Sequence, residues 1–143
     1  MGRVGEGRPA TAPPVPGWGS AGLLAALMLT WSLLCRPVPS VNEPHYLAKA
    51  KHYWQPQWCA QDFFLESSNP HLVFYQTVGA LTNWLSLPQA ALVGRTLALV
   101  LLAWSWTRLI GRLSDARGAA LGSGCLFLLL HALGHLSGEW LVG

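Results

Sequence analysis

The chain has 143 residues, of which 52% are hydrophobic and only 10% are charged, and its formal net charge is +3. Soluble domains usually carry about 25% charged residues, so this composition excludes a water-facing surface of ordinary extent. The apolar residues form blocks separated by short polar stretches, which indicates membrane spans rather than one soluble core. The arginines cluster at the ends of these blocks and not on one exposed face. The expected partner is therefore the lipid bilayer and not nucleic acid.

Residues 1–17 are rich in proline and glycine and are predicted to form a disordered cytoplasmic tail. Residues 18–35 follow without a charge, and their 18 residues are just enough to cross about 30 Å of hydrocarbon. We expect a first transmembrane helix here. A cleaved signal peptide is the alternative, with a loose cleavage site at residues 38–40. The apolar blocks that follow favour an uncleaved anchor.

Residues 36–89 are the most polar part of the chain and are predicted to form an external loop with two interfacial helices, 44–54 and 70–85. A helix over residues 70–85, opened by Asn69 and Pro70, would reach only about 24 Å, too short for a span. On a helical wheel, the side chains of this segment fall on two faces. One arc holds His71, Tyr75, Gln76, Gly79, Thr82 and Asn83, and the other holds Val73, Phe74, Val78, Leu81, Trp84 and Leu85.

Residues 90–110 and 119–138 are predicted to be the second and third transmembrane helices, joined by a cytoplasmic loop at 111–118. Arginines flank this loop, and positively charged loops stay in the cytoplasm. The expected topology is multi-pass in the bacterial inner (plasma) membrane, with a cytoplasmic N-terminus. Residues 139–143 would begin the next external segment. Because three helices would expose many polar groups to lipid, we expect the chain to be the first part of a longer protein.

Acidic and basic residues near the outer membrane face are the candidates for chemistry. Glu43 lies just past the first apolar block and is a candidate general base or metal ligand, or else a helix-capping acid. Asp62 is a second external carboxylate, which could instead pair with a lysine. Arg95 lies inside the outer end of the second predicted span, where an arginine snorkels, pairs or binds an anion such as a phosphate.

His131, His135 and Glu139 are spaced i, i+4 and i+8 on the last predicted helix. Such a spacing suits a divalent metal, and a hydrogen-bonded buried network is the alternative. The three cysteines are far apart and form no CxxC pair, so they predict neither a zinc knuckle nor a redox motif.

Several runs together resemble an uncharacterised family of bacterial polytopic membrane proteins that is common in planctomycetes. These runs are residues 42–47, 58–59, 62–67 and 71–75, and the ending at residues 138–143 is similar to that family as well. The resemblance covers residues 40–143 and implies a multi-span protein that continues past this point. It implies no established activity.

More distantly, the layout resembles the GT-C glycosyltransferases that use lipid-linked sugars, such as protein mannosyltransferases and aminoarabinose transferases. In those proteins Asp-Glu-x-x-Tyr opens the first external loop, a surface helix begins Lys-Pro-Pro-Leu, and the next span begins Ala-Ala-Arg-Leu. The three patterns are matched here at Glu43 and Tyr46, at Pro70 and Leu72, and at Arg95. The resemblance implies a polyprenyl-phosphate-linked sugar as the donor and an inverting displacement at the outer membrane face.

One position departs from that pattern. The first acid, which would serve as the base, is Asn42 in this sequence, and an amide cannot accept a proton as a carboxylate does. Either Glu43 or Asp62 would have to take over this role, or the chemistry has been lost.

The leading hypothesis is therefore the N-terminal part of a GT-C-like glycosyltransferase in which Tyr46, His71 and Arg95 bind the substrate. The first alternative is a non-enzymatic membrane component, such as a transporter part or an assembly factor, whose histidine face lines a polar path. The second alternative is a metal-binding membrane anchor that uses the same histidines.

Overall fold

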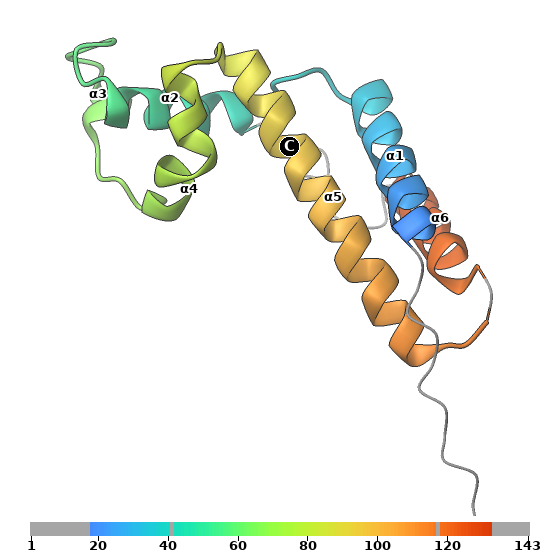
Figure 1. The fold of residues 1–143 in the computed structure, drawn as a ribbon. Coiled ribbons are helices and arrows are strands. Elements are labelled where there is room, and N and C mark those ends of the chain that lie inside the picture. Colours follow the sequence, from blue (N-terminus) through green and yellow to red (C-terminus); the bar gives the residue numbers. More distant parts are fainter. Residues whose placement is uncertain (1–17, 41, 117, 133–143) are drawn as a thin grey trace, which may run out of the picture.

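A computed structural model describes residues 18–40, 42–116 and 118–132, and this part of the chain is all helical. Helices α1 (Trp18–Cys35), α5 (Leu87–Leu113) and α6 (Ala119–Ala132) pack against one another as a bundle, while the segment between α1 and α5 forms a lobe at one end (Figure 1). The all-helical prediction is confirmed. The predicted tail at 1–17 and the last segment at 139–143 lie outside the described residues, as does the end of the third predicted span.

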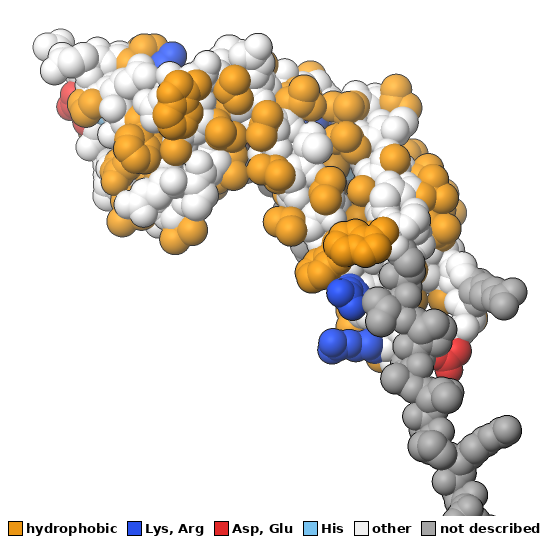
Figure 2. All heavy atoms as spheres, in the orientation of Figure 1, with side chains coloured by type: hydrophobic (Ala, Val, Ile, Leu, Met, Phe, Trp, Pro, Cys, Tyr) orange, Lys and Arg blue, Asp and Glu red, His pale blue; other side chains and the backbone are white. Residues whose placement is uncertain are grey.

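Two of the three bundle helices are long and apolar enough to cross a membrane. They are α1, with 18 residues, and α5, with 27 residues, each with a mean hydropathy of 1.5. The described part of α6 is apolar and has 14 residues. Hydrophobic side chains lie along the face of the bundle seen in Figure 2, and lysine or arginine side chains gather near the end at which α5 terminates. This surface suits contact with lipid better than contact with water.

Helix α5 is longer than the predicted second span at both ends, since it begins at Leu87 and ends at Leu113. Its start is fixed by a capping box: the Ser86 hydroxyl accepts a hydrogen bond from the Gln89 amide, and the Gln89 side chain accepts one from the Ser86 amide. Pro88 lies in the first turn, where a missing N–H has no cost. This Ser-x-x-Gln signal is visible in the sequence.

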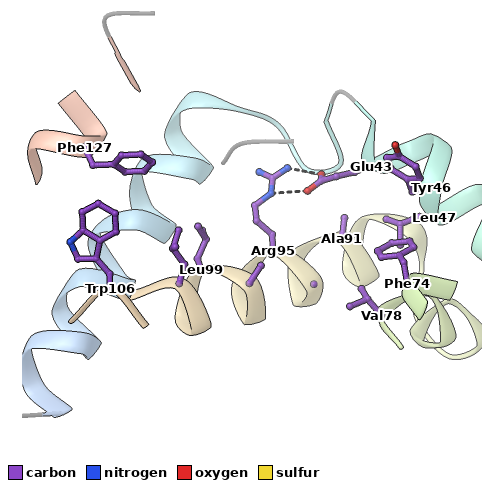
Figure 3. Close-up of a pocket in the computed structure, with 13 residues that line it drawn as sticks. Glu43, Tyr46, Leu47, Phe74, Val78, Ala91, Arg95, Leu99, Trp106 and Phe127 are labelled. Atoms are coloured by element: carbon purple, nitrogen blue, oxygen red, sulfur yellow. Dashed lines mark hydrogen bonds and ion pairs between the residues drawn. The ribbon is translucent and has the colours of Figure 1, made fainter. Parts of the chain in front are cut away.

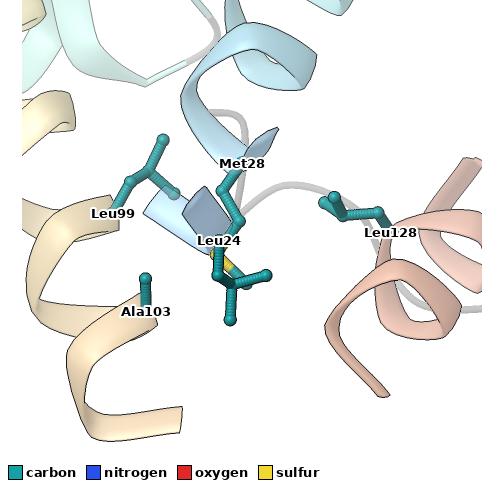
Figure 4. Close-up of a cluster of buried hydrophobic side chains, with 5 residues drawn as sticks. All are labelled: Leu24, Met28, Leu99, Ala103 and Leu128. Atoms are coloured by element: carbon teal, nitrogen blue, oxygen red, sulfur yellow. The ribbon is translucent and has the colours of Figure 1, made fainter. Parts of the chain in front are cut away.

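The three bundle helices share one buried cluster. It consists of Leu24 and Met28 from α1, Leu99 and Ala103 from α5, and Leu128 from α6 (Figure 4). Leu24 and Met28 are fully buried at its centre. The helices approach closely at Gly124, where an added Cβ would lie 2.5 Å from Leu24 Cδ1. Small residues at a helix crossing are typical of packing in membranes, where close backbone approach takes the place of a hydrophobic driving force.

The lobe is built around α2 (Glu43–Trp54), against which α3 (Phe63–Glu66), α4 (Leu72–Gln76) and the 3₁₀ helix η1 (Val78–Asn83) pack. Leu47 of α2 is buried against the first residues of α5, in a cluster with Ala90 and Ala91. This second cluster joins the lobe to the end of the bundle at which α5 begins. Figure 1 shows the lobe beside that end of α5.

The predicted continuous helix over 70–85 is wrong in detail. The chain is not helical at residues 69–71, the helix begins only at Leu72, and the backbone breaks at Thr77 before η1 begins. The physical reason lies at Gly79, where a Cβ added to the glycine would lie 2.5 Å from the Ala50 Cβ. The backbone at Gly79 therefore packs directly on α2, and the segment bends to allow this contact. The break also costs little free energy, because the residues at it are poor helix formers, namely Thr77, Val78 and Gly79.

The two arcs predicted for this segment do not correspond to one buried face and one exposed face. Tyr75, Gly79 and Thr82 are buried against the lobe, whereas Val73 and Trp84 are each 78% exposed. Small and hydroxyl-bearing residues permit the close approach to α2, and Thr82 donates its hydroxyl proton to the Gly79 carbonyl at 2.7 Å. In the apolar arc, Val73 and Trp84 are available to an outside partner such as lipid. Three other members of that arc pack against the cluster of Leu47, Ala90 and Ala91; they are Phe74, Leu81 and Leu85.

The close crossing at Gly124 predicts a specific sensitivity. Gly124→Ala should lower stability by about 1–3 kcal/mol, because Leu24 is enclosed and cannot move aside. Gly122→Ala on the same helix meets nothing within 4 Å and should be neutral or stabilising by up to about 1 kcal/mol. Unfolding of both variants in detergent, followed by circular dichroism, measures the difference. Equal stabilities would show that α6 does not pack on α1 in this way.

Candidate functional site

A buried ion pair joins the lobe to the bundle. Arg95 lies two turns inside the start of α5, and Glu43 is the first residue of α2. The Arg95 Nε–H group donates to Glu43 Oε1 at 3.0 Å, and Nη2 donates to Oε2 at 2.6 Å (Figure 3). Only 4% of the Arg95 side chain and 21% of the Glu43 side chain are exposed. This is the two-pronged geometry in which a guanidinium binds a carboxylate most strongly.

The polar atoms around the pair complete its hydrogen bonding. Arg95 Nη1 donates to Ser32 Oγ at 3.4 Å, and Nη2 donates to the Pro37 carbonyl at 3.2 Å and to Ser40 Oγ at 3.3 Å. The Ser40 amide donates to Glu43 Oε2 at 2.8 Å. The cluster therefore connects the end of α1, the following loop, α2 and α5. In a buried pair with its remaining polar atoms satisfied in this way, the Coulomb attraction and the added hydrogen bonds offset the cost of desolvation.

This geometry narrows the roles expected for the two residues. Both Glu43 oxygens already accept hydrogen bonds, so Glu43 would have to leave Arg95 before it could accept a proton from a substrate. The guanidinium fork of Arg95 is likewise occupied, so a phosphate would compete with Glu43 for it. The sequence left three roles open for Arg95: snorkelling, pairing with an acid, or binding an anion. The structure shows pairing with an acid.

An apolar pocket of about 610 Å³ includes this ion pair in its lining and extends along α5. Arg95 and Glu43 lie near its middle, with apolar residues on both sides of them (Figure 3). Tyr46 also lines the pocket. Its remaining lining is entirely apolar: Leu47, Phe74, Val78, Ala91, Gly94, Ala98, Leu99, Leu102, Trp106 and Phe127. Most of these residues belong to α5, and the small ones, Ala91, Gly94 and Ala98, leave the space.

A second pocket, of about 650 Å³, lies within the lobe. Its lining combines aromatic and polar side chains: Asn42, His45, Tyr46, Ala48, Trp58, Cys59, Asp62, Phe64 and Leu65. Tyr46 lines both pockets and so stands between them. Sequence reasoning selected Asp62 and Tyr46 but missed Trp58 and His45. The sequence signal that could have identified these two residues is the high density of aromatic residues in a polar loop.

Asp62 is held by a tight turn. Cys59 and Gln61 both have left-handed backbone conformations, with φ of 52° and 73°, and the Gln61 amide donates to Glu66 Oε1 at 2.7 Å. One Asp62 oxygen, Oδ1, accepts a hydrogen bond from the Leu65 amide at 3.0 Å and caps α3. Asp62 therefore has less of its carboxylate engaged within the protein than Glu43 has.

His71 and Tyr46 lie in contact in the lobe, with ring centroids 4.9 Å apart and nearly perpendicular planes. The structure thus brings Glu43, Tyr46, His71 and Arg95 into one neighbourhood. Tyr75 lies beside His71 and is fully buried, and its hydroxyl has no hydrogen-bond partner among the described residues. Burial raises the pKa of Tyr75, and the nearby Tyr46 raises it further.

The predicted metal site lies mostly outside the described residues. His131 is near the end of α6, with its ring 6.4 Å from that of Phe127, whereas His135 and Glu139 are beyond the described part of the chain. Within residues 18–40, 42–116 and 118–132, no group of three or more His, Cys, Asp or Glu side chains is arranged to hold a metal. A divalent metal at His131, His135 and Glu139 stays a prediction.

The ion pair predicts a stability effect that can be separated from activity. Glu43→Gln should cost about 2–3 kcal/mol, because it leaves the buried guanidinium without a counter-charge at a partly exposed position. Glu43→Gln combined with Arg95→Met should recover much of this loss, since no buried charge remains. Unfolding in detergent measures both, with the exposed Glu66→Gln as the control. The account is wrong if Glu43→Gln costs no more than Glu66→Gln.

Comparison with protein-family models, with curated proteins and with solved structures finds no match for this chain. The function is therefore argued from the geometry of the ion pair and the two pockets.

Proposed function

We propose that this chain forms the donor-binding part of a GT-C-like glycosyltransferase that uses a polyprenyl-phosphate-linked sugar. The observation that carries the proposal is the largely apolar pocket along an apolar helix, whose lining includes one charged pair, Glu43 and Arg95. A lipid-linked donor combines the same two features, a long apolar chain and a charged phosphate.

The dimensions of the apolar pocket favour one hydrocarbon chain as its occupant. Its lining on α5 runs from Ala91 to Trp106, a distance of about 22 Å at 1.5 Å per residue. An extended hydrocarbon chain can lie along such a length, and the pocket volume of about 610 Å³ lies within the range of small-molecule sites, which is about 300–1,000 Å³.

In the proposed reaction, an acceptor hydroxyl oxygen attacks the anomeric carbon of the donor sugar from the face opposite the phosphate. The new glycosidic C–O bond forms as the old C–O bond to phosphate breaks, and polyprenyl phosphate leaves with the bonding electron pair. The base that takes the hydroxyl proton is Asp62 rather than Glu43. Asp62 lines the lobe pocket with one oxygen in a capping bond, whereas both Glu43 oxygens are engaged by Arg95 and the Ser40 amide.

The ion pair has a positioning role in this proposal. It fixes Tyr46, three residues along α2 from Glu43, at the boundary between the two pockets. Arg95 contacts the donor phosphate only when Glu43 shares or releases the guanidinium fork. His71 supports Tyr46 through the contact of their rings.

The proposed orientation places the lobe at the outer face of the inner membrane and the end of α5 in the cytoplasm. Arg112 lies in the last turn of α5, and positive charge is retained on the cytoplasmic side. The exposed apolar residues of the lobe, among them Phe63, Val73 and Trp84, suit the membrane–water boundary. On this orientation α1, α5 and α6 form three spans.

Reporter fusions test this orientation. A reporter fused after Gln57 should be active only outside the cytoplasm, and one fused after Arg112 only inside, because Gln57 lies in the lobe and Arg112 lies in the last turn of α5. Activity of the Gln57 fusion in the cytoplasm would contradict the orientation and, with it, donor binding at the outer face.

The choice of base predicts the effect of two isosteric substitutions. Asp62→Asn should lower sugar transfer by about 10²–10⁴-fold, since a general base contributes about that much. The fold should persist, because asparagine caps a helix as well as aspartate does. Glu43→Gln should mainly reduce the folded fraction, and it should lower the turnover of the folded protein less than Asp62→Asn does, because Glu43 acts by positioning and not as the base. Transfer of labelled sugar from polyprenyl-phosphate glucose by membranes containing the protein measures this. A silent Asp62→Asn together with an inactive Glu43→Gln would reverse the assignment, and full activity of both would refute catalysis by either.

A non-enzymatic membrane component is the second candidate function, and one observation favours it. Glu43, the acid that matches the GT-C pattern, is engaged in a satisfied ion pair. In that case the chain would bind a lipid without transferring its sugar, as a transporter part or an assembly factor would. Lipid binding that survives while Asp62→Asn changes no transfer activity would support this alternative.

A further inference from the structure

The lobe pocket has features that a catalytic acid alone does not explain. Three aromatic side chains, Tyr46, Trp58 and Phe64, line it together with the hydrogen-bonding groups of Asn42, His45 and Asp62. Its volume of about 650 Å³ lies within the range of small-molecule sites, which is about 300–1,000 Å³. Aromatic walls with a few polar groups are typical of such sites.

Two of the three rings already carry a cation of the protein. Lys51 Nζ lies 4.8 Å from the ring centroid of Trp58, and Lys49 Nζ lies 4.9 Å from that of Phe64. Lys49 is only 5% exposed, and its ammonium group also donates to the Phe64 carbonyl and the Ser67 hydroxyl. Because neither lysine lines the pocket, the ring surfaces that form its lining stay open to a ligand.

The acid in the lining, Asp62, determines the hydrogen bonding that a ligand needs. Neither Lys49 nor Lys51 is part of the lining, so a phosphate or carboxylate would face the Asp62 carboxylate without a basic side chain in the pocket wall. A ligand that donates hydrogen bonds to a carboxylate is therefore favoured over an anion.

The backbone of Trp58 is held by a hydrogen bond, and a lysine lies over its ring. The His52 ring nitrogen Nδ1 hydrogen-bonds with the Trp58 carbonyl at 2.8 Å, and Lys51 stacks on the ring itself. Pre-ordered aromatic surface binds with a smaller loss of conformational entropy than a mobile side chain. An apolar ring face beside hydrogen-bonding groups matches a flat molecule with apolar faces and polar edges.

We propose that the lobe pocket lined by Trp58, Tyr46 and Asp62 binds a neutral pyranose sugar. The C–H face of the sugar packs on the aromatic side chains, and its hydroxyl groups donate to Asp62 and bond with Asn42 and His45. This inference rests on the proposed function and gives the sugar its own subsite, separated by Tyr46 from the pocket for the lipid chain.

Saturation-transfer NMR on the full chain in nanodiscs, with methyl glucoside, methyl galactoside and methyl mannoside as probes, tests the subsite. At least one probe should bind, and Trp58→Ala should weaken its binding by about fivefold or more, because a stacked ring contributes about 0.5–1.5 kcal/mol beyond its buried area. Asp62→Asn should weaken binding as well. The matched control is Trp84→Ala, which removes an exposed tryptophan of the same lobe that lines neither pocket, and it should leave binding unchanged.

Three outcomes would overturn the proposal: no methyl glycoside binds, Trp58→Ala binds as the parent does, or Trp84→Ala weakens binding as much as Trp58→Ala does. Competition by choline or inorganic phosphate as effective as by the glycosides would also overturn it, since the pocket would then not select a neutral ligand.

A comparison of lipid probes identifies the source of the sugar. If Trp58→Ala weakens binding of polyprenyl-phosphate glucose but not of polyprenyl phosphate, the pocket holds the donor sugar. If it weakens only the methyl glycosides, the pocket holds the acceptor, and both results support a sugar site. Sugar binding without any binding of polyprenyl phosphate would leave the subsite standing and refute the proposed donor, so the two failures are distinguishable.

Discussion

The ion pair between Arg95 and Glu43 is the interaction on which the arrangement of this chain depends. A guanidinium within an apolar helix is costly unless its charge and its N–H groups are matched. Glu43 supplies the charge, and Ser32, Ser40 and the Pro37 carbonyl supply further acceptors. Because these partners come from α1, the loop and α2, satisfying one side chain brings three separate segments to α5.

The position of the lobe follows from this constraint, and so do the two pockets. With Glu43 held at α5, the next turn of α2 places Tyr46 and Leu47 over the start of that helix. Small residues of α5 then leave an apolar pocket on one side of Tyr46, while the turn that carries Asp62 leaves an aromatic pocket on the other. An apolar space and a polar space that share one wall suit a substrate with an apolar chain and a sugar. This match is the physical basis of the proposed function.

Much of the helical framework was predictable from the sequence. The uncharged run 18–35 has the same bounds as α1, and the prediction of an all-helical chain is confirmed. The segment 70–85 was harder, because its break at Thr77 depends on the backbone of Gly79 meeting Ala50, a contact between elements distant in the sequence. The pairing of Glu43 with Arg95 also depends on a contact between distant elements, so the sequence identified each residue as a candidate but not the two as partners. Likewise, the sequence did not predict that Trp58 and Asp62 line the same pocket.

The central claim is that the pocket anchored by the ion pair holds a lipid chain, and photo-crosslinking tests it most directly. Polyprenyl phosphate with a diazirine in its chain would be added to the protein in nanodiscs and irradiated, and the labelled peptides would be mapped by mass spectrometry. The account predicts labelling at pocket-lining positions such as Ala98, Leu102 and Phe127, and its loss with excess unlabelled polyprenyl phosphate. Labelling confined to outward-facing positions such as Leu97 and Leu101, unaffected by competitor, would contradict it.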